Sequence, residues 1–228
     1  MKCRVLRKMA GVAAITTLAS TALVPVPAFA EWWNYFDLSS SHWVVSSGVF
    51  DWTEERGIIH GTARKWRPDA QITRAEAAGI LWNYHGNPAP KSNPNFPDAS
   101  TLSWASDAVA WCAEQGIFSG DSSTGAFNPW TPLTREQSAK ILFIVSKDHP
   151  SSLSSFQGFQ DPESVSSWAQ GVMSWAVQNG IITGRQTANG AYLDAKEGCT
   201  RAEFAAMLYR VEDKYGEPEK PGALEAPI

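Results

Sequence analysis

Thr73-Arg74-Ala75-Glu76 recurs twice further along the chain, as Thr134-Arg135-Glu136-Gln137 and as Thr200-Arg201-Ala202-Glu203. Each copy has the form of a capping box. In a capping box the Thr hydroxyl accepts a hydrogen bond from the backbone N–H three residues later, and the Glu or Gln at that position reaches back to the Thr N–H. Apolar residues at helical spacing follow each copy. The sequence therefore predicts three equivalent helices in a repeat protein.

The first helical position holds an arginine in all three copies: Arg74, Arg135 and Arg201. A cation is mildly unfavourable there, because the N-terminus is the positive end of the helix dipole. A helix N-terminus with free amides beside a guanidinium can receive a carboxylate or a phosphate. The alternative is that Arg is a good helix former that pairs with a surface acid, but recurrence at equivalent positions favours the anion site. We expect exposed side chains whose replacement by Ala weakens binding with little effect on folding.

An aspartate after an aromatic residue marks the start of each repeat, at Asp37, Asp98 and Asp161, which lie 61 and 63 residues apart. Two tryptophans follow each Asp, and we expect most of them to be packing anchors, with the first of each pair in the core. These are Trp43 with Trp52, Trp104 with Trp111, and Trp168 with Trp175. A spacing of seven in the second and third repeats predicts an amphipathic helix of about three turns. The spacing of nine in the first repeat predicts an irregular start.

Each of these helices is expected to end at a left-handed glycine, followed by two apolar residues and a second glycine. The first glycines are Gly57, Gly116 and Gly180, and the second are Gly61, Gly120 and Gly184. The second glycine permits a tight turn or close approach of the backbone to a ligand. A loop of variable length then leads to the capping box. It holds an aromatic-x-Pro element in the first two repeats and an extended loop, Arg185 to Gly198, in the third.

The first thirty residues have the features of a secretory signal peptide: a basic start, a short apolar stretch and Ala28-Phe29-Ala30 as the cleavage site. We therefore expect an exported protein. The apolar stretch of about fourteen residues is too short to span a membrane, which needs roughly twenty.

Composition excludes several classes of function. Removing the leader takes away four of the 19 basic residues and no acid, so the mature chain has 15 basic and 23 acidic residues and a net charge of −8. This balance argues against nucleic-acid binding, and an anionic ligand would need local arginine sites. Cys112 and Cys199 remain, either as a disulfide or as two buried thiols. We find no metal-binding motif, expect no cofactor, and see no paired carboxylates or nucleophile for an enzyme.

The ordered recurrence of Phe-x-Asp, Trp, Gly-Ile-Ile-x-Gly, aromatic-x-Pro and Thr-Arg-Ala-Glu resembles the S-layer homology (SLH) domain family over about residues 31 to 215. The resemblance implies an all-α fold, with three helix-loop-helix repeats in a pseudo-threefold arrangement around a central three-helix bundle. It also implies secretion to the cell wall or surface layer. There the grooves between repeats would hold the chain on an anionic, pyruvylated secondary cell-wall polysaccharide, without a covalent bond.

By position, the resemblance assigns polysaccharide binding to nine residues. They are Arg74, Arg135 and Arg201, Asp37, Asp98 and Asp161, and Gly61, Gly120 and Gly184. For the Asp residues a capping role in a turn is an equal alternative. The grooves are not expected to be equivalent, because Glu136 stands beside an arginine and the first repeat carries the extra cations Arg64, Lys65 and Arg67. We expect the first groove to be the best formed.

The expected organisation is a signal peptide (1–30), repeat 1 (31–86), a linker (87–95), repeat 2 (96–146), a linker (147–158), repeat 3 (159–215) and a disordered tail (216–228). Two other functions stay open. One is a structural subunit that assembles with itself or recruits a surface-protein partner. The other, more remote, is a wall hydrolase. The sequence does not choose the glycan or the number of active grooves.

Overall fold

Three helices begin at the predicted capping boxes: α3 (Arg74–Tyr84), α5 (Arg135–Ser146) and α7 (Arg201–Tyr215). The Thr73 hydroxyl accepts from the Glu76 N–H at 3.3 Å, and the Thr73 N–H donates to the Glu76 carboxylate at 3.0 Å. The same reciprocal pair joins Thr134 with Gln137 and Thr200 with Glu203. The prediction of three equivalent helix starts is therefore confirmed.

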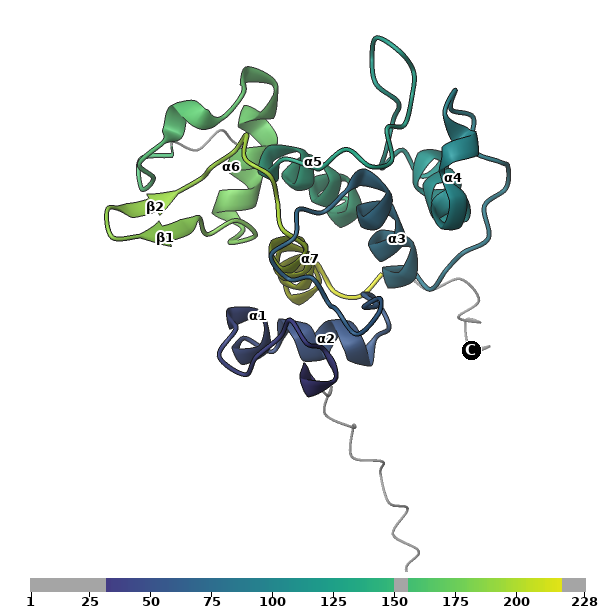
Figure 1. Ribbon diagram of the computed structural model, residues 1–228. Helices are drawn as coiled ribbons and strands as arrows, with labels where there is room; N and C mark the ends of the chain where they lie inside the picture. The colour runs from purple at the N-terminus through teal and green to yellow at the C-terminus, as the bar shows by residue number, and fades with distance from the viewer. Residues whose placement is uncertain (1–31, 150–155, 219–228) are drawn as a thin grey trace, which may run out of the picture.

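The computed structural model describes residues 32–149 and 156–218, and this part of the chain is mainly helical (Figure 1). The signal peptide predicted at 1–30, residues 150–155 of the second linker and residues 219–228 of the tail lie outside the described residues. The remaining α-helices are α1 (Trp43–Ser46), α2 (Val49–Glu55), α4 (Ser106–Glu114) and α6 (Gln170–Gln178). Short 3₁₀ turns are η1 (Trp32–Asn34), η2 (Ala99–Thr101), η3 (Ser103–Ala105), η4 (Pro162–Ser164) and η5 (Ser167–Ala169).

The first helix of each repeat ends where the sequence predicts. Gly57, Gly116 and Gly180 follow α2, α4 and α6 with φ values of 61°, 69° and 68°, a conformation that costs a glycine little. The irregular start expected in repeat 1 is also confirmed, because Gly48 at φ 78° separates α1 from α2. In repeats 2 and 3 the helix is shorter than expected. Trp104 and Trp168 lie in the preceding 3₁₀ turns η3 and η5, so they do not share a helical face with the second Trp.

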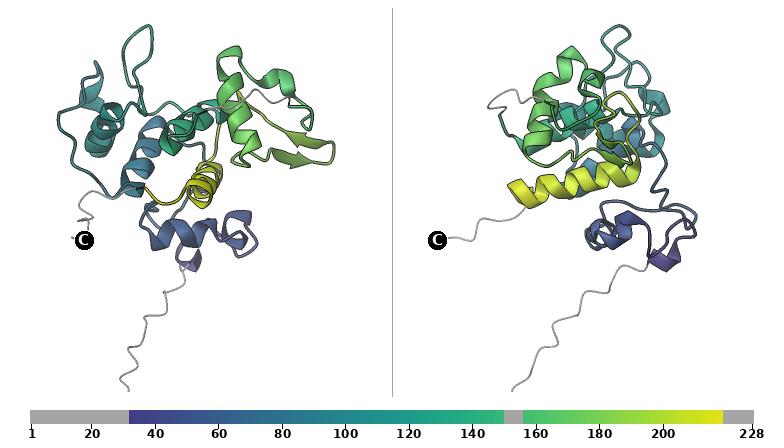
Figure 2. Two further views of the ribbon diagram at one scale, coloured as in Figure 1. Left: turned by 180° about the vertical axis from the view of Figure 1, so that it is seen from behind. Right: turned by 90° about the vertical axis from the view of Figure 1, so that its left-hand side faces the viewer.

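Each capping helix packs against the first helix of the next repeat. α3 of repeat 1 contacts α4 of repeat 2, α5 of repeat 2 contacts α6 of repeat 3, and α7 of repeat 3 returns to α2 of repeat 1. The helix α7 also contacts α5, and the two views in Figure 2 show it lying between the α1–α2 segment and the rest of the chain. No repeat therefore buries its capping helix with its own first helix alone.

A closed cycle of backbone hydrogen bonds joins the three repeats just before their capping boxes. The Leu133 N–H donates to Ile72 O, the Cys199 N–H to Leu133 O, and the Ile72 N–H to Cys199 O, each at 2.9 Å. All three side chains are buried in the hydrophobic core. Because these donors have no access to water, their pairing fixes the register of all three repeats at once.

The extended loop of repeat 3, Arg185 to Gly198, contains a β-hairpin that the sequence analysis did not predict. The strands β1 (Arg185–Thr187) and β2 (Gly190–Tyr192) pair antiparallel across a two-residue turn, with Thr187 opposite Gly190. The two turn residues are Ala188 and Asn189, and Gly190, the first residue of β2, has a φ of 118°, a conformation that L side chains rarely adopt. The hairpin lies before Leu193 and Asp194, whose N–H groups donate to Asp161 as those of Phe127 and Asn128 in the aromatic-x-Pro element donate to Asp98.

The core is one cluster that includes the second Trp of each pair: Trp52, Trp111 and Trp175. Cys112 and Cys199 are both buried and free, so no disulfide joins them. Burial raises the pKa of the Cys199 thiol to about 12, so at neutral pH it stays protonated and behaves as a small apolar side chain.

Removing a capping hydroxyl is expected to cost stability. Thr200→Ala leaves the Glu203 N–H without its acceptor and should lower the free energy of unfolding by about 1 kcal/mol, measured by urea denaturation. Thr183→Ala, at an exposed position outside any capping box, is the matched control and should unfold like the wild type. Equal unfolding free energies for the two variants would contradict this role of the cap.

Candidate functional site

Three grooves lie at equivalent places, and each is built from all three repeats. Groove 1 is lined by Ile58, Ile59, His60, Thr62, Arg67, Glu76, Gly79, Ile80, Trp82, Asn83, Trp104, Ala108 and Arg201. Groove 2 is lined by Arg74, Ile117, Phe118, Ser119, Gly120, Asp121, Ser122, Asn128, Thr131, Leu133, Gln137, Lys140, Ile141 and Trp168. Groove 3 is lined by Trp43, Asp69, Arg135, Ile182, Thr183, Gly184, Arg185, Gln186, Thr200, Glu203, Ala206, Met207 and Arg210.

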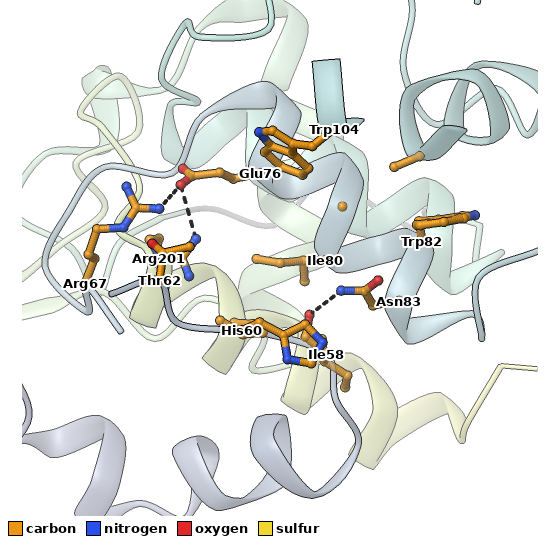
Figure 3. Close-up of a pocket in the computed structure, with 13 residues that line it drawn as sticks. Ile58, His60, Thr62, Arg67, Glu76, Ile80, Trp82, Asn83, Trp104 and Arg201 are labelled. Carbon is orange, nitrogen blue, oxygen red and sulfur yellow. Dashed lines mark hydrogen bonds and ion pairs between the residues drawn. The ribbon is translucent and has the colours of Figure 1, made fainter. Parts of the chain in front are cut away.

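The three grooves share one arrangement of elements. Its floor is the Gly-x-x-x-Gly loop and the capping helix of one repeat, its arginine comes from the preceding repeat, and a tryptophan from the following repeat stands at its edge. Figure 3 shows this arrangement in groove 1, where Arg201 and Trp104 reach α3 from different sides. The cavities measure about 320, 390 and 620 Å³ for grooves 1, 2 and 3, within the usual range of small-ligand sites.

The three predicted arginines reach across to a neighbouring repeat. Arg74 Nε donates to Phe127 O at 2.6 Å, Arg135 Nε to Leu193 O at 2.7 Å, and Arg201 Nε to Trp66 O at 3.1 Å. These carbonyls belong to the loop before the next capping box. Each arginine therefore lines the groove of the next repeat and ties the two repeats together.

The expectation of free helix amides beside these arginines is wrong. The N–H groups of the first two helical residues donate to carbonyls of the neighbouring repeat, as Arg74 does to Thr131 O at 3.0 Å and Ala75 to Pro129 O at 2.9 Å. The expectation of three exposed side chains is also wrong, because Arg135 and Arg201 are only 3% and 4% exposed. The cause is the packing of each helix start against the next repeat, which the sequence of one repeat does not show.

Two of the grooves contain an ion-paired triad. In groove 3, Glu203 contacts Arg135 Nη1 at 2.8 Å and Arg185 Nε at 2.7 Å. In groove 1, Glu76 pairs with Arg67 and lies 3.3 Å from Arg201 Nη1. Burial alone would raise the pKa of the Glu203 carboxyl, but the guanidinium groups of Arg185 and Arg135 outweigh it and lower the pKa. Both carboxylates also complete a capping box, so each has a structural and an electrostatic task.

The predicted aspartates lie outside the lining of the grooves. Asp98 accepts from the backbone N–H groups of Phe127 and Asn128, both at 2.8 Å. Asp37 and Asp161 accept the equivalent pair in repeats 1 and 3. Each carboxylate thus holds the loop that carries the carbonyl to which an arginine of the preceding repeat donates. The capping alternative does not describe this geometry, because Asp98 and Asp161 make no side-chain hydrogen bond to the turns that they begin. Their carboxylates hold backbone N–H groups 29 and 32 residues further along the chain.

The predicted glycines are close to protein atoms. A Cβ at Gly61 would lie 2.2 Å from the Tyr35 ring, and one at Gly184 would lie 2.7 Å from the Phe159 ring. At Gly120 the obstacle is the Gly125 carbonyl oxygen, at 2.3 Å. The close approach predicted for a ligand is therefore made by the chain itself. Gly120 and Gly184 still line grooves 2 and 3. In groove 1 the lining includes His60 and Thr62, the neighbours of Gly61, but not Gly61 itself.

The expectation that the first Trp of each pair is in the core is wrong. Trp43, Trp104 and Trp168 are 42%, 59% and 52% exposed, and each stands at the edge of a groove. In repeats 2 and 3 the next residue, Ala105 or Ala169, is fully buried. The Ser-Trp-Ala triplet common to both repeats was the available signal, because burial of the small Ala turns the adjacent Trp outward. Trp104 lies over Gly79 of α3, where a Cβ would come within 3.1 Å of its ring.

A comparison with known families matches the S-layer homology domain three times, at residues 34–78, 95–139 and 158–205. The chain belongs to the S-layer homology domain family. Within residues 32–149 and 156–218, no helix is long and apolar enough to cross a membrane. The same described residues contain no group of three or more His, Cys, Asp or Glu side chains that could hold a metal ion.

Named relatives carry the SLH-like part within much longer chains. The surface-layer 125 kDa protein of Lysinibacillus sphaericus is 31% identical over 220 residues, which are 96% of this chain and 18% of that protein. S-layer protein sap of Bacillus anthracis is 26% identical over 208 residues, 90% of this chain and 24% of that one. Exoglucanase XynX of Acetivibrio thermocellus is 27% identical over 170 residues, 73% of this chain and 15% of that enzyme. The chain thus spans less than a quarter of the length of each of these relatives.

The burial of the arginines predicts unequal effects of the same substitution. Arg135→Ala removes a buried charge that pairs with Glu203 and should lower the free energy of unfolding by about 3 kcal/mol. Arg74→Ala removes hydrogen bonds from a half-buried side chain and should cost about 1 kcal/mol. Urea denaturation of the two variants measures the difference, and equal losses would contradict it.

Ion pairing of Glu203 predicts a pH dependence of stability. Its pKa in the folded chain is lowered, and the unfolded value is about 4.3. The carboxylate therefore contributes stability above the unfolded pKa and loses it as the pH falls through the folded pKa. The free energy of unfolding, measured in urea, should decline from about pH 5 to pH 3, and should decline less in Glu203→Gln. Gln keeps the capping box, as Gln137 does in repeat 2, so identical slopes would argue against the ion pair.

Proposed function

We propose that this SLH protein is exported and anchors itself to the cell envelope by binding an anionic, pyruvylated secondary wall polysaccharide in the grooves between repeats. The observation that carries the proposal is that each groove combines an arginine, an exposed tryptophan and an apolar floor. In this proposal the three repeats have a pseudo-threefold arrangement around a central bundle of α3, α5 and α7. The cyclic backbone hydrogen bonds support that arrangement.

The chemistry of the grooves suits a sugar. A pyranose ring has apolar C–H faces and a polar edge, so it is recognised by an aromatic plane together with a few hydrogen-bonding groups. In groove 1 the Trp104 ring and the side chains of Ile58 and Ile80 supply the apolar surfaces, with Asn83 and Thr62 beside them (Figure 3). A few polar groups in a mainly apolar hollow is the usual composition of a small-ligand site.

An acidic substituent on the sugar would account for the arginines. A guanidinium binds a carboxylate with two parallel hydrogen bonds, which adds geometric selectivity to the attraction of charge. Because the mature chain is expected to carry a net charge of −8, an acidic polymer is repelled at long range. Recognition would then depend on contacts inside the grooves, so binding should persist at moderate salt.

Co-sedimentation with purified cell-wall sacculi tests the proposal. The mature protein, residues 31 to 228, is mixed with sacculi before and after hydrofluoric acid has removed the attached polymers. Binding that is lost after stripping supports a polymer-directed anchor. Binding that is retained points to peptidoglycan. The absence of binding in both cases overturns the proposal and favours a self-assembling or partner-recruiting protein.

The exposed tryptophans at the groove edges give a sharper test. Trp43→Ala, Trp104→Ala and Trp168→Ala should each weaken binding to untreated sacculi, and the triple variant should weaken it by at least about tenfold. Trp130→Ala is the matched control, since Trp130 is 53% exposed and lines none of the three grooves. A Trp130 variant that loses as much binding as the triple variant would point to nonspecific adhesion by surface aromatics.

A further inference from the structure

Repeat 1 carries an exposed surface outside the three grooves. Phe36 and Trp33 are 70% and 56% exposed, near the start of the described residues. Arg64 and Lys65 are exposed as well, and the guanidinium carbon of Arg64 lies 4.2 Å from the centre of the Phe36 ring. These four residues form the N-terminal patch. Of the three extra cations of repeat 1, only Arg67 lines groove 1, so Arg64 and Lys65 belong to a different surface.

The loop that carries Arg64 is fixed to the segment that carries the two aromatic residues. The Phe36 N–H donates to Arg64 O at 2.9 Å, and Arg64 Nε donates to Asn34 O at 3.1 Å. Neither Arg64 nor Lys65 forms an ion pair with a carboxylate of the described residues. The cations are therefore held beside the aromatic rings and keep their charge available to a partner.

The other repeats show that the fold does not need these side chains. In repeat 3 the Gln160 N–H donates to Ala191 O at 2.9 Å, which is the same backbone pair that Phe36 and Arg64 make in repeat 1. No cation stands at any of the equivalent positions, counted from the contact between the aspartate and the loop of each repeat. These positions hold Pro94, Pro97, Gly125 and Ala126 in repeat 2, and Gln157, Gln160, Ala191 and Tyr192 in repeat 3. The patch is thus an addition to the common repeat.

Arg64 also has a backbone conformation that favours glycine. Its φ is 57°, and the preceding Ala63 has a φ of 49°. The equivalent residue of repeat 2 is Gly125, with a φ of 70°, which glycine adopts at little cost. Strained residues of this kind cluster at functional sites, where the side chain is needed in that place. Repeat 1 accepts the strain and thereby places a cation over an exposed aromatic ring.

The chemistry of the patch suits the surface of an anionic lipid bilayer. Aromatic side chains settle at the boundary between headgroups and acyl chains, and Lys and Arg contact acidic headgroups. None of the four side chains can accept a hydrogen bond, so the patch offers nothing to the hydroxyl protons of a neutral sugar. Its positive charge is opposite to the net charge of −8 expected for the mature chain. Trp33 also lies only three residues after the expected cleavage site at Ala30, where the leader would enter the membrane during export.

We propose that the N-terminal patch binds the surface of an anionic membrane, as a contact separate from the grooves. Trp33 and Phe36 enter the boundary between headgroups and acyl chains, while Arg64 and Lys65 contact the acidic headgroups. This inference rests on the export of the chain in the proposed function, and it does not depend on polysaccharide binding in the grooves.

Co-sedimentation of the mature protein, residues 31 to 228, with lipid vesicles tests the inference. The wild type should bind vesicles of equimolar phosphatidylglycerol and phosphatidylcholine at least about tenfold more tightly than vesicles of phosphatidylcholine alone, because only the former carry acidic headgroups. The double variant Trp33→Ala/Phe36→Ala should bind the anionic vesicles at least about tenfold more weakly than the wild type. Trp130→Ala is the matched control, since Trp130 is 53% exposed and lies outside the patch, and it should bind like the wild type.

Arg64→Gly separates binding from folding. The variant gives repeat 1 the residue that repeat 2 has at this place and relieves the strain of a positive φ. It should therefore unfold at the same urea concentration as the wild type or at a higher one, and yet bind the anionic vesicles several-fold more weakly. An Arg64→Gly variant that binds these vesicles as tightly as the wild type would contradict the inference.

The remaining outcomes separate this inference from the proposed function. If the wild type does not bind anionic vesicles, or if the double variant binds them equally well, the membrane assignment is wrong. A double variant that keeps vesicle binding but loses binding to membrane-free sacculi assigns the patch to the wall polymer instead. If the wild type binds vesicles through the patch but does not bind sacculi, the proposed anchoring through the grooves fails and the membrane contact stands.

Discussion

The cycle of hydrogen bonds among Ile72, Leu133 and Cys199 is the constraint on which the rest of the structure depends. Each of these residues immediately precedes a capping Thr, so the cycle places three helix starts around one point. With no water to serve as an alternative partner, a shift of one repeat would leave buried donors and acceptors unpaired in both of its neighbours. The positions of the three capping helices are therefore set together and not one at a time.

The same placement explains why the grooves are composite. Once each helix start faces the loop of the next repeat, its first side chain, the arginine, can only extend into that neighbour. The arginine Nε donates a hydrogen bond to a backbone carbonyl of the neighbour's loop, that of Phe127, Leu193 or Trp66. The aspartate that marks each repeat fixes this loop from the other side through two backbone N–H groups. The arginines and aspartates thus act on the same loop, and a single repeat cannot form a groove.

Local features were predictable from the sequence, and features that depend on a neighbouring repeat were not. The capping boxes and the left-handed glycines involve residues at most a few positions apart, so their spacing decides them. The exposure of Trp104 depends on α3 of another repeat, and the burial of Arg135 depends on Glu203 and Leu193, which lie far along the chain. Helical periodicity predicted that Trp104 is in the core. That prediction assumed that Trp104 belongs to the helix, whereas it lies in a 3₁₀ turn before the helix.

The third position of each capping helix shows how such a repeat protein can diverge without losing its fold. The cap needs only an oxygen that accepts from the Thr N–H, and both Glu and Gln supply one. The charge of that side chain acts on an arginine that comes from the preceding repeat, as Glu203 does on Arg135. Exchange between Glu and Gln therefore leaves the helix start intact while it adds or removes a counter-ion in a groove. In this chain Gln137 completes the cap of α5 without a charge, while Glu76 and Glu203 complete the caps of α3 and α7 and also pair with arginines of grooves 1 and 3.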